Sequence, residues 1–307
     1  MTVGGYTFTY PDVARRESLL DIMNMLEPTD TQLLSGFKQS SASNTLHEWT
    51  IDTLEAVGVN VNAEGADAPA DASNDPTRPQ NVTQIFAKTA KITGTELGVN
   101  RVGGNRMTRE LMKKMKALKN DIEFALVRGT IASGVASTSA ASARSLRGIK
   151  SWITGLTSNY SGATLTETVL NDIFETVWAN GAETDAVYTS MKGKRRVSGF
   201  TAGATKQVQL TDRRLVNAVD VYQADAAKMV KLFPHRHVTI AGDYGTTSTP
   251  GFDVLALQED TWAVAFYRKP FTKQLPENGD YEAKEMITEL TLEARQQAAN
   301  NYGKVLF

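Results

Sequence analysis

The clearest hydrophobic pattern in the chain lies between residues 105 and 129. Apolar residues recur there at spacings of three and four: Met107, Leu111, Met115, Leu118, Ile122 and Ala125. This spacing predicts one amphipathic helix over 107–128, with a polar side made up of Arg109, Lys113, Lys116 and Glu123. Asn105 is expected to cap the helix and Gly129 to end it. A single apolar stripe on a helix of roughly 33 Å predicts a surface spine, not a central core helix.

A long polar segment precedes this helix. Alternating residues predict strands over 46–54 and 82–97, and the loop between them, 55–78, is rich in Ala, Asn, Asp, Gly and Pro and poor in large apolar residues. A loop of this length inside a compact domain is uncommon unless it has a function. The pattern therefore predicts a two-stranded arm that projects from the body.

The first 45 residues are mixed. Tyr6, Phe8 and Tyr10 alternate like a short strand, and short helices are predicted over 18–25 and 29–36. The segment has little core of its own, so we expect it to pack on its own body or on a neighbour.

A second unit is predicted to begin near residue 146, after a linker over 130–145 that is rich in Ser, Ala and Thr. A capping-box pattern at 164–167 predicts a helix that stops at Asn180 and Gly181. A buried strand over 186–190, a basic helix over 192–197 and a strand or hairpin over 219–240 follow, which indicates a mixed α/β unit.

The C-terminal part is predicted to be rich in strands. Trp262, Val264 and Phe266 alternate with smaller residues, a turn is expected over 276–280, and alternation over 286–293 predicts one long half-buried strand.

Composition excludes several classes of protein. The 307 residues are 41% hydrophobic and 22% charged, as in an ordinary globular protein, and the net charge of −1 gives no global attraction to nucleic acid or to an anionic membrane. The absence of cysteine excludes disulfides, zinc–thiolate sites and a cysteine nucleophile, and is consistent with assembly in a reducing cytoplasm. There is no apolar run of about 18 residues and no secretory signal, so we expect no membrane association.

Candidate catalytic chemistry is sparse. His235 and His237 could form half of a metal site, but no third ligand is suggested nearby, so we interpret them as hydrogen-bonding residues at a strand end and His47 as a packing residue. Gly193–Lys194 lacks the spacing of a phosphate loop, and Gly103–Gly104 is interpreted as a hinge in preference to an anion cradle. We expect no catalytic residue, no cofactor and no metal.

Two short basic clusters are candidate nucleic-acid contacts. Lys192, Lys194, Arg195 and Arg196 form one, and Arg213 and Arg214 form the other. Neither has the aromatic platforms or the strongly basic face that such binding favours, so a solvated or salt-bridging surface is expected.

Several local motifs stand in a particular order along nearly the whole chain. They are Asn44-Thr45-Leu46-His47-Glu48-Trp49, Glu64-Gly65-Ala66-Asp67, Thr83-Gln84-Ile85-Phe86, Lys119-Asn120-Asp121-Ile122-Glu123, Asn278-Gly279-Asp280 and Glu289-Leu290-Thr291-Leu292-Glu293. Together with the order of predicted elements, they make the chain resemble the major capsid proteins of tailed bacteriophages, which have the Hong Kong 97-type fold.

The resemblance implies an α+β fold with five parts. They are an N-terminal arm (1–45), an extended two-stranded loop (46–100), a peripheral domain (101–145) with a spine helix over 105–128, a mixed α/β axial domain (146–260), and return strands of the peripheral domain with the C-terminus (261–307).

The resemblance also raises the question of a covalent link between subunits. Some relatives join a lysine of the extended loop to an asparagine of a neighbour, but residues 54–81 contain no lysine, so we expect no such bond despite Asn300 and Asn301. We expect the acidic loop to lie on a basic surface of the adjacent subunit, such as its spine, held by charge and shape. The predicted contact residues are Glu55, Glu64, Asp67, Asp71, Asp75, Arg78, Lys113 and Lys116, with Lys114 and Lys119 on the same helix.

The function that the resemblance implies is structural. The chain would assemble into hexamers and pentamers of an icosahedral shell around double-stranded DNA, in a virion formed in the host cytoplasm, with scaffolding, portal and decoration proteins as further partners. No N-terminal scaffolding segment is visible, so a separate scaffolding protein or none is expected. An encapsulin-like compartment shell and a soluble enzyme with a long lid loop are the alternatives.

Overall fold

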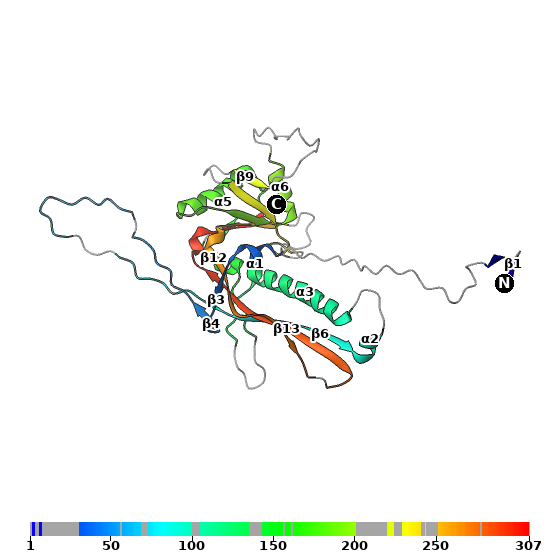
Figure 1. Ribbon diagram of the computed structural model, residues 1–307. Coiled ribbons are helices and arrows are strands. Elements are labelled where there is room, and N and C mark those ends of the chain that lie inside the picture. Colours follow the sequence, from blue (N-terminus) through cyan, green and yellow to red (C-terminus); the bar gives the residue numbers. More distant parts are fainter. Residues whose placement is uncertain are drawn as a thin grey trace.

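A four-stranded sheet forms the long axis of the molecule. In the computed structural model, β12 (Trp262–Gln274) and β13 (Tyr281–Ala294) form an antiparallel hairpin, β6 (Gln84–Thr93) pairs with the outer side of β13, and the short β3 (Lys38–Ser41) runs parallel to β12. The helix α3 (Arg106–Arg128) lies along this sheet (Figure 1). The structure describes residues 2–3, 6–7, 31–55, 57–68, 73–99, 105–134, 143–155, 157–160, 162–200, 220–223, 229–240, 243, 251–276 and 278–306.

A six-stranded sheet forms the second unit. Its strand order is β7 (Thr157–Asn159), β14 (Asn301–Leu306), β11 (Phe252–Leu257), β8 (Ala186–Thr189), β10 (Met229–Pro234) and β9 (Val221–Gln223). Parallel and antiparallel pairs both occur, and the helices α5 (Glu167–Ala179) and α6 (Met191–Ser198) accompany the sheet. The mixed α/β unit predicted from the sequence is therefore confirmed.

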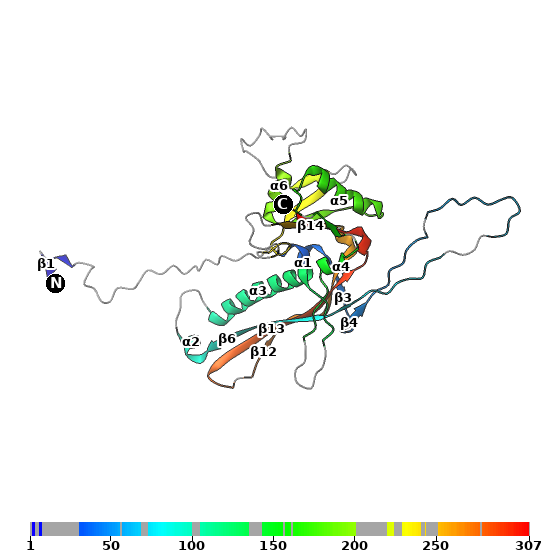
Figure 2. The same cartoon turned by 180° about the vertical axis from the view of Figure 1, so that it is seen from behind.

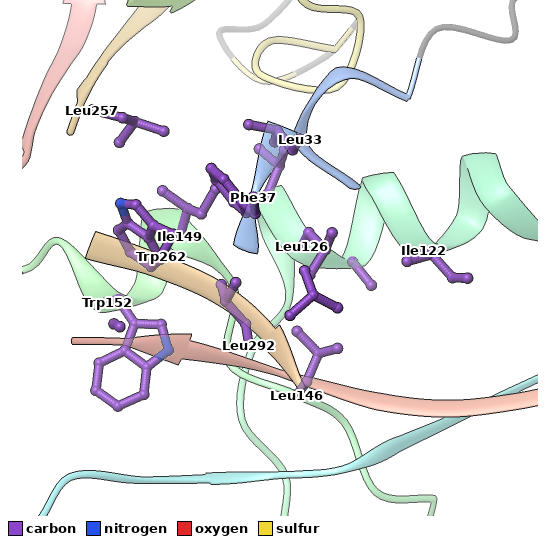
Figure 3. Close-up of a cluster of buried hydrophobic side chains, with 14 of the residues drawn as sticks. Leu33, Phe37, Ile122, Leu126, Leu146, Ile149, Trp152, Leu257, Trp262 and Leu292 are labelled. Carbon is purple, nitrogen blue, oxygen red and sulfur yellow. The ribbon is translucent and has the colours of Figure 1, made fainter. Parts of the chain in front are cut away.

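The central strands of this sheet are buried on both faces. Alternate residues of a strand point to opposite faces, and here Val187 and Val254 pack with α5 and α6 while Tyr188, Leu255 and Leu257 join the main core. The main core lies where the two units meet. Its residues come from both sheets and from α1 (Gln32–Gly36), α3 and α4 (Ile149–Trp152), as Figure 3 shows for Leu33, Leu126, Trp152, Leu257 and Trp262.

The predicted spine helix begins and ends where its caps indicate. The Asn105 side chain accepts hydrogen bonds from the backbone N–H groups of Met107 (2.9 Å) and Thr108 (3.3 Å), and Gly129 closes the last turn. The prediction of a surface helix holds only for the N-terminal half, where Met112 and Met115 are exposed. In the C-terminal half, one side of the helix, which includes Leu118, Ile122 and Leu126, is buried in the main core.

Glu123 is the clearest exception to the polar side of this helix. It was assigned to the solvated face, but its side chain is fully buried. Oε1 accepts hydrogen bonds from the Leu33 N–H (2.7 Å) and from His235 Nε2 (3.0 Å), and Oε2 accepts one from the Leu34 N–H (3.0 Å). The Leu33 and Leu34 amides belong to the first turn of α1, which Thr31 does not cap with its side chain. Glu123 therefore caps α1 and ties it to the second unit.

Residues 31–45 are part of the body, not of a free arm. Leu33 and Phe37 lie in the main core, and β3 pairs with β12 from Ala263↔Lys38 to Phe266↔Ser41. The predicted boundary of the arm at residue 45 is therefore too late. Of the earlier predictions, the strand at Tyr6 is described as β2 (Tyr6–Thr7), paired with β1 (Thr2–Val3), whereas the helix predicted over 18–25 lies outside the described residues.

The C-terminus also departs from the predicted domain plan. Residues 301–306 were assigned to the peripheral return strands, but β14 pairs with β11 and β7 in the six-stranded sheet. Conversely α4, assigned to the second unit, is buried in the main core against α3. Both segments bury apolar residues across the junction between the units, which strand alternation alone does not reveal.

The two strands of the projecting arm are shorter than predicted. Regular pairing at its root is limited to β4 (Leu46–Glu48) with β5 (Gln80–Val82) and a bridge between Ile51 and Thr77. After β6, Gly94 opens the short helix α2 (Gly94–Gly98), and a side chain at Gly94 would collide with the Asp280 carboxylate. Figures 1 and 2 both show the projecting loop between β4 and β5 leaving the body on the side away from α2.

Two further predictions needed small corrections. The capping pattern at 164–167 predicted Thr164 as the cap, but α5 is capped by Thr166, whose hydroxyl accepts a hydrogen bond from the Val169 N–H (3.3 Å). The strand predicted as half-buried over 286–293 is almost wholly buried. The core covers one face, and the other is covered by polar side chains that include Thr83, Arg144 and His47.

Replacing Glu123 by Ala tests the junction. The change leaves two α1 amides and His235 without their acceptor inside the core, so we expect a loss of about 3 kcal/mol or more in the free energy of unfolding. The measurement is urea unfolding of unassembled subunits.

Glu110→Ala is the matched control on the same helix. It removes a carboxylate that pairs near the surface with Arg106 (3.2 Å) and Lys113 (3.4 Å), and should cost less than about 1 kcal/mol. Equal losses for the two variants would contradict the role assigned to Glu123.

Candidate intersubunit contact surfaces

The projecting loop is firmly anchored at its root. His47 on β4 lies with Nε2 2.8 Å from Glu293 Oε1 on β13, and Trp49 donates from Nε1 to the Ala294 carbonyl (3.0 Å). The Trp49 ring also packs against Trp152, with ring centroids 5.5 Å apart. His47 therefore packs against Trp49, as the sequence indicated, and it also pairs with the buried carboxylate of Glu293.

Asn81 anchors the second strand of the root. Its side chain is fully buried and donates from Nδ2 to the carbonyls of Leu292 (2.8 Å) and Arg147 (3.1 Å), while Oδ1 accepts from the Arg147 N–H (2.9 Å). Thr83, which lies between β5 and β6, donates from its hydroxyl to Glu289 on β13 (2.7 Å). The root is thus held to β13 by directional bonds from both of its strands.

Glu293 is the most strongly perturbed group of the root. Burial alone would raise the pKa of its carboxyl, but hydrogen bonds from His47, Ser40 and Arg295, with the charge of Arg295, outweigh burial and hold the pKa at about 2. The carboxylate is therefore ionised at neutral pH, and it is bonded to β3, to β4 and to Arg295 at the end of β13.

Beyond the root, the loop carries its charges into solvent. Glu55, Glu64, Asp67 and Asp75 are exposed, and Asp71 lies outside the described residues. The Arg78 side chain is 72% exposed and lies 3.7 Å from Glu48. The predicted acidic surface is therefore present on the described part of the loop, with nothing from its own body covering it.

The predicted basic partners lie on α3, away from the loop of the same chain. Lys113 is 3.4 Å from Glu110, and Lys116 is exposed. Within the ranges that the structure describes, no ion pair joins a loop carboxylate to a lysine of α3. A single chain does not bring the two sets of residues together, so whether they meet between copies stays a prediction.

The loop also has apolar side chains that its overall polar composition conceals. Leu54, Val57, Val59 and Val61 are 95%, 104%, 92% and 79% exposed. The alternation of the three valines with Gly58, Asn60 and Asn62 was visible in the sequence, but the loop was classified by its overall polar composition.

Two buried carboxylates of β13 were also missed. Besides Glu293, the Glu289 side chain is 3% exposed and receives Arg144 (2.7 Å), Arg268 (2.9 Å) and Thr83. Alternation had indicated a polar, solvated face for these residues. The partners that bury them, such as Thr83 and Arg144 for Glu289 and His47 for Glu293, lie far away in the sequence, so local alternation could not find them.

The histidine pair behaves as a hydrogen-bonding group at a strand end, directly after β10. His235 Nδ1 accepts from the His237 N–H (3.2 Å), so the proton on Nε2 points at Glu123. Burial lowers the pKa of His237. In the described ranges, no group of three or more His, Cys, Asp or Glu side chains is arranged to hold a metal ion.

The first basic cluster lies on α6. Lys194 pairs with Asp220 (2.6 Å), as expected for a salt-bridging surface, while Arg195 and Arg196 are exposed. Gly193 packs where a Cβ would collide with Thr189 and Phe252, which gives this glycine a packing role. Arg213, Arg214, Gly103 and Gly104 lie outside the described residues.

The two asparagines near the C-terminus are buried and serve the fold. Asn300 Oδ1 accepts from the Gln258 N–H and from Trp262 Nε1, both at 2.9 Å, and its Nδ2 donates to the Gln296 carbonyl (2.9 Å). Asn301 is fully buried beside α5. Both side chains are enclosed within their own chain. None of the helices described is long and apolar enough to cross a membrane.

Several solved structures with a similar fold come from phages or are described as capsids. The capsid of a native GTA particle matches with a TM-score of 0.62 at 11% identity, over 96% of each chain. A protein of Mycobacterium phage Cain matches with a TM-score of 0.59 at 13% identity, over 95% of each chain. The capsid of Myoviridae phage XM1 matches with a TM-score of 0.58 at 11% identity, over 94% of this chain and 97% of the other. These likenesses show the α+β fold of the Hong Kong 97 type.

Sequence comparison points the same way. The major capsid protein of Escherichia phage Phieco32 is 29% identical over 123 residues, which cover 39% of this chain and only 35% of that protein's length. The family described as SU10 major capsid protein matches residues 1–306. Because that match spans almost the whole chain, the protein belongs to the SU10 major capsid protein family.

Proposed function

We propose that this protein is the structural subunit of the icosahedral head shell of a tailed phage, which assembles around double-stranded DNA through non-covalent contacts and performs no enzymatic reaction. The observation that carries the proposal is the family match over residues 1–306. An exposed loop with a rigid root, and without a partner surface in its own chain, supports it. The relatives named above are capsid or phage proteins, which favours this function over a compartment shell or an enzyme.

The parts of the chain can be assigned to roles in a shell. The long sheet with α3 would form the peripheral domain, and the six-stranded sheet with α5 and α6 would form the axial domain around the symmetry axes of hexamers and pentamers. Residues 46–82 would form the extended loop, which is shorter than the predicted range of 46–100 because β6 pairs with β13 in the body. The chain up to residue 30 would be the arm, since α1 and β3 belong to the body.

The loop is suited to reach a neighbouring subunit. Its root is held to β13, so the exposed part is delivered in a defined direction. Each exposed ion pair between a loop carboxylate and a lysine of another copy would contribute only about 0–1 kcal/mol. Closed symmetry repeats the contact in every subunit, so small terms can set register and salt sensitivity.

Further partners follow from the same role. We expect packaged DNA against the inner face without sequence specificity, and portal, scaffolding and decoration proteins at other surfaces. Assembly would take place in the host cytoplasm, and the finished protein would be part of the virion.

Negative-stain microscopy of the purified protein tests the proposal directly. We expect closed shells or capsomers, and DNA in particles isolated from infected cells. A stable monomer at every concentration and salt condition tried would refute the function, and enclosed enzymes in place of DNA would indicate a compartment shell.

Charge reversal tests the loop contact. The double variant Glu64→Lys/Asp67→Lys should assemble less well at low ionic strength than the wild type and should lose most of the salt dependence of assembly, because like charges would face the lysines of α3. Light scattering over a salt series measures both effects. Combining it with Lys113→Glu/Lys116→Glu should restore part of the assembly.

A matched control carries the same change in net charge elsewhere. Asp172→Lys/Glu175→Lys alters two exposed residues of α5 and should leave the salt dependence unchanged. If both double variants behave alike, the loop carboxylates have no special role.

The pKa of Glu293 gives a prediction about pH. A carboxyl whose folded-state pKa is about 2, against an ordinary value of 4.5, stabilises the fold fully above pH 4.5, and this contribution is lost as the pH falls towards 2. The difference corresponds to roughly 3 kcal/mol at neutral pH. Glu293→Gln should therefore lower the free energy of unfolding at pH 7 and flatten its decline between pH 5 and 3.

Urea unfolding of unassembled subunits across this pH range provides the measurement. Glu64→Gln, which changes an exposed carboxylate of the loop, serves as the control and should follow the wild type. A Glu293→Gln curve that runs parallel to the wild-type curve would contradict the role of this carboxylate.

A further inference from the structure

The chain contains two Asn-Gly dipeptides, at 180–181 and at 278–279, and both lie where the chain turns. The contacts proposed above involve neither of them. This dipeptide is chemically special because glycine has no Cβ, so its backbone nitrogen can approach the side chain of the preceding asparagine closely. The two dipeptides therefore have the same intrinsic reactivity, and their surroundings decide whether it is expressed.

The reaction is an intramolecular acyl transfer, favoured because the two groups are held next to each other. The glycine backbone nitrogen gives its proton to a base in the solvent and forms a bond to the asparagine Cγ. The bond from Cγ to Nδ2 breaks, and the side-chain nitrogen takes up a proton and leaves as ammonia. Water then opens the cyclic imide at either carbonyl, which gives aspartate or isoaspartate. Solvent supplies both co-reactants, and no oxidation or reduction takes place.

The fold protects the first dipeptide, which closes helix α5. The Gly181 N–H donates to the Trp178 carbonyl (2.8 Å), and Asn180 Nδ2 donates to the Thr176 carbonyl (2.6 Å). The attacking nitrogen and the leaving amide are thus both bonded to the end of the helix. Gly181 is also held in the left-handed region, with φ 78°. Reaction at Asn180 requires these bonds to break.

The second dipeptide is open to solvent at the tip of the β12–β13 hairpin. Asn278 and Gly279 are both exposed. Among the described residues, none accepts a hydrogen bond from the Gly279 N–H or bonds to the Asn278 side chain. The Gly279 carbonyl accepts from the Tyr281 N–H (2.8 Å), which shapes the turn without engaging either reacting group.

The strands below the tip do not depend on its conformation. Their pairing reaches Gln274↔Lys284, and the Leu275 N–H donates to the Ala283 carbonyl (2.9 Å). Figures 1 and 2 show this tip at the end of the body that also carries α2, away from the junction of the two units. Ring closure at Asn278 therefore needs no opening of the core, so it can take place in the folded protein.

We propose that Asn278 is a site of spontaneous modification in the folded protein, where the amide is converted through a cyclic imide to aspartate and isoaspartate, while Asn180 stays intact. The inference does not depend on the proposed function.

The products change the tip in two ways. Each event adds a negative charge two residues before Asp280, whose carboxylate lies against Gly94 at the start of α2 and whose carbonyl accepts from the Gly94 N–H (3.1 Å). Isoaspartate also lengthens the backbone by one carbon, which alters the path of the chain into Asp280. We therefore expect a more acidic hairpin tip with a changed contact to α2.

Peptide mapping of the full-length protein tests the proposal. The folded protein is incubated at mildly alkaline pH in ¹⁸O-labelled water, digested and analysed by mass spectrometry, and isoaspartate is detected with a protein isoaspartate methyltransferase. We expect the product at residue 278 to increase with time and to carry the labelled oxygen. Conversion at Asn180 should be slower by about tenfold or more, because two hydrogen bonds must first break there.

The chain unfolded in urea is the matched control. Its two sites should convert at similar rates, because the bonds that protect Asn180 are lost. The inference is overturned if Asn278 converts no faster than Asn180 in the folded protein, or if urea leaves the ratio of the two rates unchanged.

Gly279→Ala provides a second test. Gly279 is not among the glycines with positive φ, and an added Cβ would lie 3.4 Å from the Tyr281 ring, an ordinary contact, so the variant should fold. Conversion at Asn278 should fall several-fold because the Cβ hinders ring closure, and conversion at Asn180 should not change. Equal rates for this variant and the wild type at Asn278 would contradict the cyclic-imide route.

Discussion

The carboxylate of Glu123 is the interaction on which the arrangement of the molecule depends. It lies fully buried where α1, α3 and the loop after β10 meet, and it accepts hydrogen bonds from Leu33, Leu34 and His235. A buried charge is costly unless its oxygens are fully bonded, so this site tolerates few alternative placements of its partners. The carboxylate therefore specifies where the chain enters the body and how the second unit sits against the spine helix.

The same principle recurs at the other junctions. Glu293 and Glu289 hold the root of the loop to β13, and Lys150 on α4 lies 2.5 Å from Asp253 on β11, which also accepts from Tyr302. Apolar packing is tolerant of small shifts, whereas these bonds are directional. The junctions between units are therefore held in a defined geometry.

This division suits a protein that acts through copies of itself. The loop leaves a rigid root with its charges and its apolar side chains exposed, and Asn300 and Asn301, which could have been considered for a covalent link, are used inside the fold. In the shell proposed here, strength would come from many weak contacts, and subunits with well-defined junctions would place each contact accurately.

The sequence by itself determined the local elements. The caps at Asn105 and Gly129, the stop at Asn180–Gly181 and the alternation of β12 and β13 depend on neighbours within a few residues, so pattern alone located them. Only the tertiary structure decided which polar residues are buried and where each segment belongs. Glu123 bonds to residues 90 and 112 positions away, and β14 joins a sheet that begins before residue 160. Helical and strand periodicity describe one element at a time, and carry no information about a partner so distant in the chain.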